Sequence, residues 1–245
     1  MLWKVEVLGA NAVLAGAVIL HLIALAGIPA FEDDHYRFIW DGWQVATFGT
    51  PYGTPPSDFF GSDYVPAALQ SILDRVNNPD VPTIYGPALE LLFAGVYALF
   101  GTELMGLRLV FAGINLLLIA MMLRRFAPEK VALYAWNPLA VSEVALHVHP
   151  DGVISAMLFG GVMLLRRQPW LAGILFALAA GTKLVALAAW PLLIRTKPSA
   201  LTAAFTALAA LYAIFLMQGA GAGFESTAIF ASQWHFNPLF YELLT

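Results

Sequence analysis

The sequence predicts an all-α polytopic membrane protein of about seven transmembrane helices. Of its 245 residues, 60% are hydrophobic and only 11% are charged, whereas soluble domains carry about 25% charged residues. The mean hydropathy of +0.75 points the same way, because so few charges cannot build a water-soluble surface. The formal net charge of −4 offers no basic face to nucleic acid. The absence of cysteine excludes disulfides, thiol catalysis and thiolate metal sites.

Apolar runs divide the chain into candidate crossings, each to be compared with the ~20 residues that span a bilayer. The first run, residues 8–29, leads directly into an acidic segment, so we interpret it as a retained anchor rather than a cleaved signal. The further runs are 83–100, 107–123, 131–146, 153–165, 171–194 and 200–217.

Basic clusters predict how these runs thread, because short loops rich in Lys and Arg stay cytoplasmic. Eight of the twelve Lys and Arg residues fall in four short clusters. The clusters are Lys4; Arg124, Arg125 and Lys130; Arg166 and Arg167; and Arg195 and Lys197. We therefore expect the N-terminus in the cytoplasm and the acidic segment 31–82 on the exported side.

The run 83–100 is predicted to stay on the exported side. An exported loop at 31–82 and a cytoplasmic Arg124 require an odd number of crossings between them, yet two apolar runs lie there. The run 83–100 follows Pro82 and carries Glu90, and a carboxylate at the bilayer centre costs ~2.5–3.5 kcal/mol on insertion scales. We therefore expect an amphipathic or re-entrant helix at the interface.

The run 171–194 is predicted to enter the membrane and return, because basic clusters flank both of its ends. The turn of this hairpin falls at residues 181–183, Gly-Thr-Lys. A single span with misplaced charges is the alternative. With the hairpin, the chain makes about seven crossings, and the tail 218–245 is exported.

This threading gathers ionisable side chains on the exported side, which indicates a site rather than ordinary solvation. The cytoplasmic loops hold little besides positive charge. The first loop contributes Asp33, Asp34, His35 and Arg37, the second His147, His149 and Asp151, the hairpin tip Lys183, and the tail Trp234, His235 and Asn237.

Each of these groups also has an ordinary structural interpretation. Asp33 and Asp34 suit the positive end of a helix macrodipole, and Asp151, directly after Pro150, suits a helix N-cap. Lys183 would then extend to the lipid head groups.

Three further features leave alternatives open. The pair His147 and His149, with Asp151, has the spacing of metal ligands, but without a further fixed ligand it does not require a metal. His21, within the first apolar run, is expected to be a packed core residue. An interfacial belt is the ordinary interpretation of the aromatic side chains in the first loop. They are Trp40, Trp43, Phe48, Tyr52, Phe59, Phe60 and Tyr64.

Residues 33–42, Asp-Asp-His-Tyr-Arg-Phe-Ile-Trp-Asp-Gly, and 49–52, Gly-Thr-Pro-Tyr, resemble the first-loop signature of GT-C glycosyltransferases. Members of this superfamily are membrane enzymes that use polyprenyl-phosphate sugars, and many related members are mannosyltransferases. Later stretches follow in the family's order. They are Ile84-Tyr85-Gly86-Pro87, Trp136-Asn137-Pro138-Leu139 with Glu143 and His149-x-Asp151, Gly181-Thr182-Lys183, and Trp234-His235-Phe236-Asn237.

The chain departs from the family pattern at two places. Gly86 stands where a proline is usual. Val148 and Pro150 flank His149, where a Gly-His-Asn-Asp-like sequence is expected. Neither change removes an ionisable group.

The resemblance implies a single GT-C-like transmembrane module over residues 1–245, equivalent to the conserved N-terminal seven-span module of the family. Within it, 31–104 would form an exported loop with juxtamembrane helices, and 218–245 an exported tail. We expect an integral protein of a bacterial or archaeal cytoplasmic membrane, with the N-terminus in the cytoplasm and the active face exported.

The resemblance also implies an inverting transfer of a mannose-like sugar from a polyprenyl-phosphate donor to an acceptor. Such a transfer needs a base for the acceptor hydroxyl, and we expect Asp34 in this role, with Asp33 next. Asp151 would orient the acceptor, a histidine or the lysine. A divalent metal bridging Asp34 and Asp151 is compatible with the sequence but not required. The expected substrate-binding residues are Arg37, Lys183, His147, His149, Tyr85, Trp234 and His235.

The expected partners are a polyprenyl-phosphate-linked sugar donor, membrane lipids and, within a larger complex, a partner membrane subunit. The alternative function is a non-catalytic GT-C-derived structural or assembly subunit of such a complex. Its exported polar groups would pair with each other or with a partner and leave no open groove. A transporter is less favoured, because the sequence shows no inverted repeat.

Overall fold

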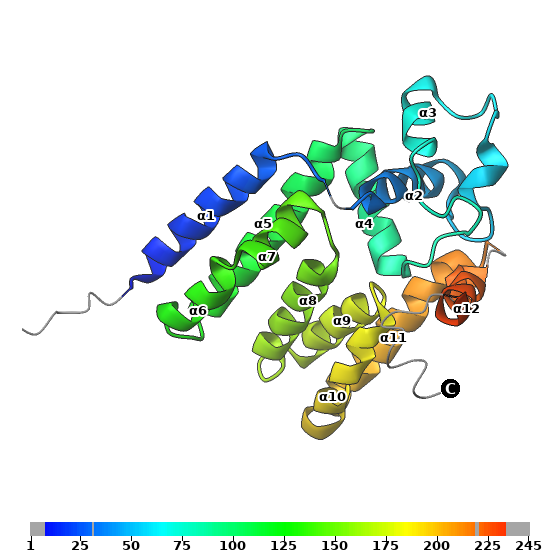
Figure 1. The fold of residues 1–245 in the computed structure, drawn as a ribbon. Coiled ribbons are helices and arrows are strands. Elements are labelled where there is room, and N and C mark those ends of the chain that lie inside the picture. The colour runs from blue at the N-terminus through cyan, green and yellow to red at the C-terminus, as the bar shows by residue number, and fades with distance from the viewer. Residues whose placement is uncertain (1–7, 31, 219–220, 234–245) are drawn as a thin grey trace, which may run out of the picture.

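Helices form all the regular secondary structure in residues 8–30, 32–218 and 221–233, which the computed structural model describes (Figure 1). The prediction of an all-α protein is confirmed for this part of the chain. Within it, α5 (Leu104–Leu123) and α11 (Pro198–Leu216) are long and apolar enough to cross a membrane. Seven crossings stay a prediction.

The first apolar run forms α1 (Ala10–Ala26), which packs against α5 and α6 (Pro128–Ala135). His21 is buried in this contact, as expected for a packed core residue. Its Nδ1 lies 2.7 Å from the Ala17 carbonyl oxygen, and its Nε2 lies 3.0 Å from Asn115 Nδ2. Tyr134 completes the chain by donating to Asn115 Oδ1 at 2.7 Å.

The segment between α1 and α5 forms a separate layer at one end of the helices (Figure 1). Its elements are α2 (Asp34–Phe48), η1 (Pro56–Phe59), α3 (Ala67–Leu73) and α4 (Pro87–Phe100). In this layer α4 packs along α2. The two backbones meet at Gly42, where a Cβ atom would lie 2.6 Å from the Phe93 carbonyl oxygen. The helices expected in the first loop are therefore present, and their position relative to a membrane stays a prediction.

The aromatic side chains of this layer do not form one exposed belt. Trp40 and Trp43 are buried in the layer's own apolar core between α2, α3 and α4, and Tyr52 is buried against Phe215 of α11. Phe60 and Tyr64 are exposed. The interpretation as an interfacial belt is therefore wrong for the buried three.

The run 131–146 is not one helix, contrary to its prediction as a span. It divides into α6, α7 (Pro138–Val141) and a π-helical turn, η2 (Ser142–Leu146). The break falls at Pro138, which has no N–H to donate and disfavours helical geometry in the residue before it. Asn137 then caps α7, accepting the Leu139 amide at 2.9 Å.

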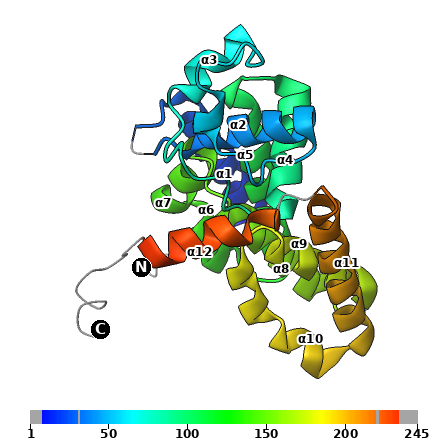
Figure 2. The same ribbon diagram turned by 90° about the vertical axis from the view of Figure 1, so that its right-hand side faces the viewer.

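The remaining helices form a second group: α8 (Asp151–Leu164), α9 (Pro169–Ala180), η3 (Leu184–Ala189), α10 (Pro191–Thr196) and α11. The chain turns between α9 and η3, at the predicted residues 181–183. Packing of α9 on α11 requires Gly173, where a Cβ atom would collide with the Ala200 carbonyl. Figure 2 shows α12 (Phe224–Gln233) lying crosswise between the first-loop layer and this group.

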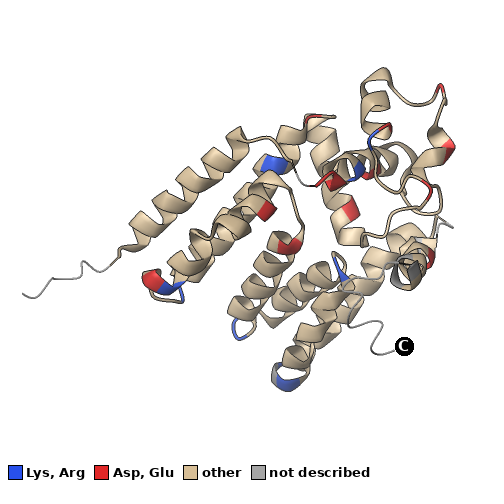
Figure 3. Ribbon diagram, in the orientation of Figure 1, with Lys and Arg blue, Asp and Glu red and all other residues tan. Residues whose placement is uncertain are grey.

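Charged residues separate along the molecule (Figure 3). The basic clusters of the α5–α6, α8–α9 and α10–α11 connections lie at one end of the helices, and most acidic residues lie at the other. Lys4 lies outside the described residues. A common end for these clusters agrees with their predicted sidedness, and the orientation in a membrane stays a prediction.

Candidate functional site

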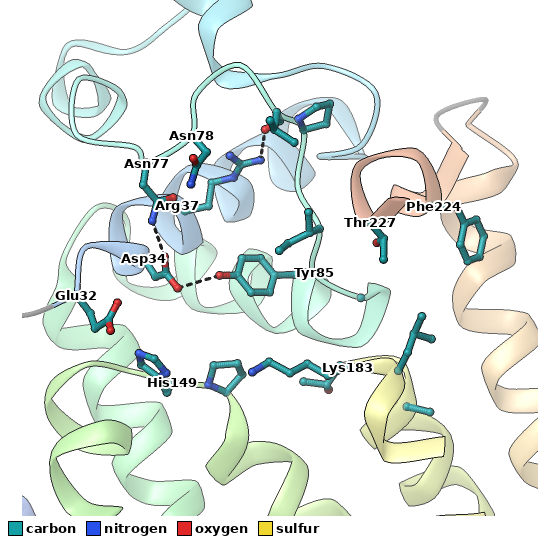
Figure 4. Close-up of a pocket in the computed structure, with 18 of the residues that line it drawn as sticks. Glu32, Asp34, Arg37, Asn77, Asn78, Tyr85, His149, Lys183, Phe224 and Thr227 are labelled. Atoms are coloured by element: carbon teal, nitrogen blue, oxygen red, sulfur yellow. Dashed lines mark hydrogen bonds between the residues drawn. The ribbon is translucent and has the colours of Figure 1, made fainter. Parts of the chain in front are cut away.

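A cavity of about 740 Å³ lies where the first-loop layer meets the second helix group (Figure 4). Its walls come from α2, the segment before α4, the loop before α8, the turn after α9, and α11 and α12. Five of the predicted site residues line it: Asp34, Arg37, Tyr85, His149 and Lys183. The sequence thus predicted five of the polar side chains that line it, and Asn77 and Asn78 are among those it did not.

Asp34 lies in the first turn of α2 and presents its carboxylate to the cavity. Its Oδ1 accepts the Asn77 side chain at 2.5 Å, and its Oδ2 accepts the Tyr85 hydroxyl at 3.1 Å. Asn77 also donates to Asp33 Oδ1 at 2.9 Å. Asp33 is exposed and does not line the cavity, so the two adjacent carboxylates lie in different environments.

Asn77 is a site residue that the sequence reasoning missed. It lies in the loop after α3 and lines the cavity together with Asn78. No motif singles it out, because its contact with Asp34 joins residues 43 positions apart. The left-handed backbone of Asn78, with φ of 45°, shapes this loop, and asparagine tolerates that conformation better than most residues.

Tyr85 is held in place by its backbone as well as its ring. Its carbonyl accepts the Tyr52 hydroxyl at 2.8 Å, and its amide donates to Thr83 Oγ1 at 3.2 Å. Burial, and then the neighbouring Asp34 carboxylate, raise the pKa of the Tyr85 phenol well above its ordinary value. The phenol therefore keeps its proton and remains a donor to Asp34.

The segment that carries Tyr85 reaches the turn after α9 through Gly86. The Gly86 amide donates to the Thr182 carbonyl at 3.3 Å, and a Cβ atom at this position would collide with the Gly181 carbonyl oxygen. A proline has no N–H and could not make this hydrogen bond. The contact explains why glycine stands here instead of the usual proline.

Lys183 and Asp151 form an ion pair beside the cavity. Lys183 Nζ lies 3.2 Å from Asp151 Oδ2 and 3.3 Å from Oδ1. Asp151 is the first residue of α8, and Pro150 occupies the N-cap position. The expected N-cap role of Asp151 is therefore wrong, since its carboxylate contacts the lysine instead.

His149 follows the π-helical turn and has its ring at the cavity wall (Figure 4). Its Nδ1 lies 3.6 Å from Glu143 Oε2, and its amide donates to the Glu143 carbonyl at 2.8 Å. Its Nε2 is buried and has no hydrogen-bond partner among the described residues. The preceding Val148 is fully buried and adopts a φ of 56°, which is strained for a β-branched residue.

Arg37 lines the cavity, but protein groups already engage its guanidinium. Its Nε lies 3.0 and 3.2 Å from the two oxygens of Asp41, and its Nη2 donates to the Val81 carbonyl at 2.8 Å. Desolvation raises the pKa of the Asp41 carboxyl, and the Arg37 charge opposes this rise. This arrangement suits positioning better than the predicted substrate binding, because the Arg37 charge is already compensated.

Glu90 lies deeper on α4, fully buried and 2.7 Å from Thr83 Oγ1. The Glu90 carboxyl therefore lies inside the first-loop layer and not on its surface. The position of the run 83–100 at a membrane interface stays a prediction.

His147 is buried and does not line the cavity, unlike His149. It lies near His35. Burial lowers the pKa of His35, the Asp33 and Asp34 carboxylates raise it in part, and the nearby His147 lowers it further. Direct contact between His147 and a ligand in this cavity is therefore not supported.

Arg108 is a second residue that the sequence reasoning missed. Its guanidinium donates to the Ala24 carbonyl, to Gly27 at 3.0 Å and to Ala145 at 3.1 Å. It thereby joins the end of α1 to the π-helical turn, and the cation suits the negative end of the α1 dipole. Its apolar surroundings in the sequence give no sign of these partners.

Two expectations about ligands stay predictions. Trp234 and His235 lie outside the described residues. Within the described ranges, no group of three or more His, Cys, Asp or Glu side chains is placed to hold a metal ion. Asp34 and Asp151 bind separate protein partners, so a metal bridge between them has no support in this geometry.

Comparison with known proteins supplies the family. Residues 4–197, most of the chain, match a family model described as alpha-(1->6)-mannopyranosyltransferase, N-terminal domain. The chain belongs to this mannosyltransferase family. Searches among curated proteins and among solved structures gave no match. Membership supports a glycosyltransferase activity, and the matched range includes every described residue of the predicted site.

Proposed function

We propose that this member of the mannosyltransferase family transfers a mannose-like sugar from a polyprenyl-phosphate donor to an acceptor hydroxyl, with inversion, as a GT-C enzyme acting on the exported face. One observation carries the proposal: the Asp34 carboxylate and the Lys183 ammonium line the same cavity. Figure 4 has Asp34 with Tyr85 on one side of that cavity and Lys183 on the other. A base and a cation on opposite sides suit a single displacement.

Asp34 would act as the general base. The acceptor oxygen attacks the anomeric carbon while its proton passes to the Asp34 carboxylate. An ionised carboxylate offers about four lone-pair sites, and Asn77 and Tyr85 occupy two of them. These two donors fix the carboxylate while leaving it free to accept the proton. The exposed Asp33 lies off the cavity and is the weaker candidate.

Lys183 would stabilise the leaving group. As the bond between the anomeric carbon and the phosphate oxygen breaks, the polyprenyl phosphate keeps the electron pair and gains negative charge. An ammonium aimed at that charge lowers the barrier, as in other preorganised electrostatic sites. Lys183 carries three N–H donors, so contact with Asp151 leaves donors for phosphate oxygens.

The lipid part of such a donor would use the apolar side of the cavity. Leu184, Tyr212 and Phe224 line this side, next to Lys183. Leu184 and Phe224 are exposed large apolar side chains. An apolar wall beside a cation suits a ligand with a phosphate head and a hydrocarbon tail.

A non-catalytic scaffold subunit would have paired polar groups and no open cavity at this position. The polar groups of the site do pair with each other, as a non-catalytic subunit would require. The cavity of about 740 Å³ is what such a subunit would lack. The open cavity favours the transferase.

Transfer from a radiolabelled polyprenyl-phosphate sugar tests the proposal, in membranes that contain this chain and any co-purifying partner. We expect label in the acceptor with the donor's anomeric configuration inverted, and no transfer from a nucleotide sugar. Loss of transfer with EDTA, and its return with a divalent cation, would favour a metal bridge between Asp34 and Asp151. Wild-type membranes that transfer nothing from any lipid donor would favour the scaffold.

A further inference from the structure

Three buried polar side chains, Asp41, Thr83 and Glu90, lie behind the cavity between α2 and α4. The proposed transfer step makes no direct use of them. Each of the three is at most 1% exposed. Thr83 Oγ1 donates to Glu90 Oε1 at 2.7 Å. The same oxygen accepts the Tyr85 amide at 3.2 Å. Thr83 therefore joins the buried Glu90 carboxyl group to the residue that holds Asp34.

A carboxyl group buried this completely either has a cation or hydrogen-bond donors beside it, or carries a proton.

The surroundings of the two carboxyl groups, Asp41 and Glu90, decide which of them carries a proton. Asp41 has a countercharge, since both its oxygens lie within 3.2 Å of Arg37 Nε. Glu90 has no ion-pair partner in the described part of the chain, and its Oε2 has no hydrogen bond there. A buried carboxylate without a cation is far more costly than a buried neutral acid, so the proton resides on Glu90.

We propose that Glu90 is protonated in the folded protein, and that Thr83 and Glu90 are positioning residues for Tyr85 and, through Tyr85, for Asp34. Thr83 donates to Glu90 Oε1 and accepts the Tyr85 amide. The neutral Glu90 thereby fixes the start of the segment that carries Tyr85.

The charged and titratable groups around Glu90 are few. Asp41 and Arg37 face it from α2, and Tyr52 faces it from the loop after α2. The positioning role rests on the proposed function, because it concerns the placement of Asp34 for transfer. The proton on Glu90 does not rest on it.

Infrared difference spectroscopy of the whole protein tests the proton. The difference spectrum between wild type and Glu90→Gln should contain the carbonyl stretch of a protonated carboxyl group. Glu103→Gln is the matched control, because Glu103 is an exposed carboxylate beyond the other end of α4. Its difference spectrum should lack that band. A Glu90→Gln spectrum without the band would overturn the proposal.

A second variant tests whether Arg37 decides where the proton resides. In Asp41→Asn, Arg37 loses its countercharge, and Glu90 should ionise to replace it. The protonated-carboxyl band should therefore disappear although Glu90 is still present. A band that persists in Asp41→Asn would overturn the role of the Arg37 charge in deciding the protonation of Glu90.

Transfer kinetics test the positioning role. Glutamine keeps the shape and an acceptor for Thr83, so Glu90→Gln should retain transfer. Glu90→Ala and Thr83→Val should lower kcat by up to ~10²-fold, because misplacement by about 1 Å can cost that much. KM should change less, and Thr83→Ser should restore kcat. A wild-type kcat in both Glu90→Ala and Thr83→Val would overturn the positioning role. If the wild-type protein transfers no sugar, the proposed function is contradicted, and the infrared spectra still test whether Glu90 is protonated.

Discussion

The backbone amide of Gly86 donates to the Thr182 carbonyl at 3.3 Å, and so joins the segment that carries Tyr85 to the turn that carries Lys183. The Ala88 amide adds a second bond, to the Gly181 carbonyl at 2.9 Å. These two bonds fix α4 against the end of α9. Because Tyr85 contacts Asp34, the same bonds set where the proposed base lies relative to the proposed phosphate-binding lysine.

Substitution of Gly86 should therefore disturb both halves of the site. In Gly86→Ala the new Cβ atom meets the Gly181 carbonyl, and overpacking of this kind costs ~1–3 kcal/mol. Gly95→Ala is the control, because a Cβ atom at that exposed position in α4 meets nothing within 4 Å. Alanine there should stabilise the helix by ~0.5–1 kcal/mol. Thermal unfolding in detergent measures both, and equal midpoints would contradict the close approach.

Asp34→Asn should abolish most sugar transfer while the protein stays folded. Asparagine is nearly isosteric but cannot accept the proton, and loss of a general base costs ~10²–10⁴-fold in rate. Because asparagine can accept from only one of Asn77 and Tyr85, the free energy of unfolding should fall by about 1–3 kcal/mol. Donor binding should also be kept.

Asp33→Asn is the matched control for this change. Asp33 shares the Asn77 contact but is exposed and lies off the cavity. The variant should therefore lose much less transfer than Asp34→Asn. If wild type transfers sugar and Asp34→Asn does so equally well, Asp34 is not the base.

Lys183→Ala should weaken binding of the lipid phosphate. Hydrogen bonds to charged groups contribute ~1.5–3 kcal/mol, which corresponds to ~10–100-fold in affinity. Lys183→Arg should recover only part of this, since a guanidinium differs from an ammonium in shape and hydration. Lys197→Ala, at the exposed α10–α11 connection, should bind as wild type does. Binding of a fluorescent polyprenyl phosphate reports the affinity, and equal values for Lys183→Ala and wild type would reduce Lys183 to a lipid-facing anchor.

The sequence predicted those parts of the site in which a motif coincides with a local structure. The Asp-Asp-His-Tyr-Arg motif begins α2, so a helix of known period places Asp34 and Arg37 on one face. The Gly-Thr-Lys turn lies between α9 and η3, where the apolar run changes direction. Composition alone sufficed for the helical class.

Contacts between distant segments could not be predicted in this way. The partners of Asn77, Arg108 and Glu90 lie in other parts of the chain, and hydrophobic periodicity carries no information about them. Glu90 is the clearest case, since a lone carboxylate in an apolar run indicates a surface position unless its buried partners are known. The broken run 131–146 failed for a different reason, because hydropathy counts Pro138 without its effect on hydrogen bonding.

Cysteine labelling tests the predicted topology, and the chain has no native cysteine to remove. Asp80 precedes α4, Glu103 lies between α4 and α5, and Arg124 follows α5. Cysteines at 80 and 103 should react with an impermeant reagent from the exported side, and one at 124 only from the cytoplasmic side. If residues 80 and 103 label from opposite sides, α4 crosses the membrane and the proposed site is divided between its two faces.

Val148 gives a test of the backbone next to His149. With φ of 56°, it adopts a left-handed conformation where the related pattern has glycine, and a Cβ atom costs about 1–2 kcal/mol there. Val148→Ala keeps that cost and Val148→Gly removes it, while both lose the buried isopropyl group. Val148→Gly should therefore be the more stable of the two by ~1 kcal/mol.

The usual order is the reverse, because glycine within a regular element is less stable than alanine by ~0.5–1 kcal/mol. Val153, equally buried but within the regular helix α8, provides the control pair. Val153→Gly should unfold at a lower temperature than Val153→Ala. If the two positions show the same order, the left-handed backbone at Val148 is wrong. If the order inverts only at 148, strain is stored beside His149, and Val148→Gly should also loosen that side chain, which NMR relaxation of a labelled histidine would detect.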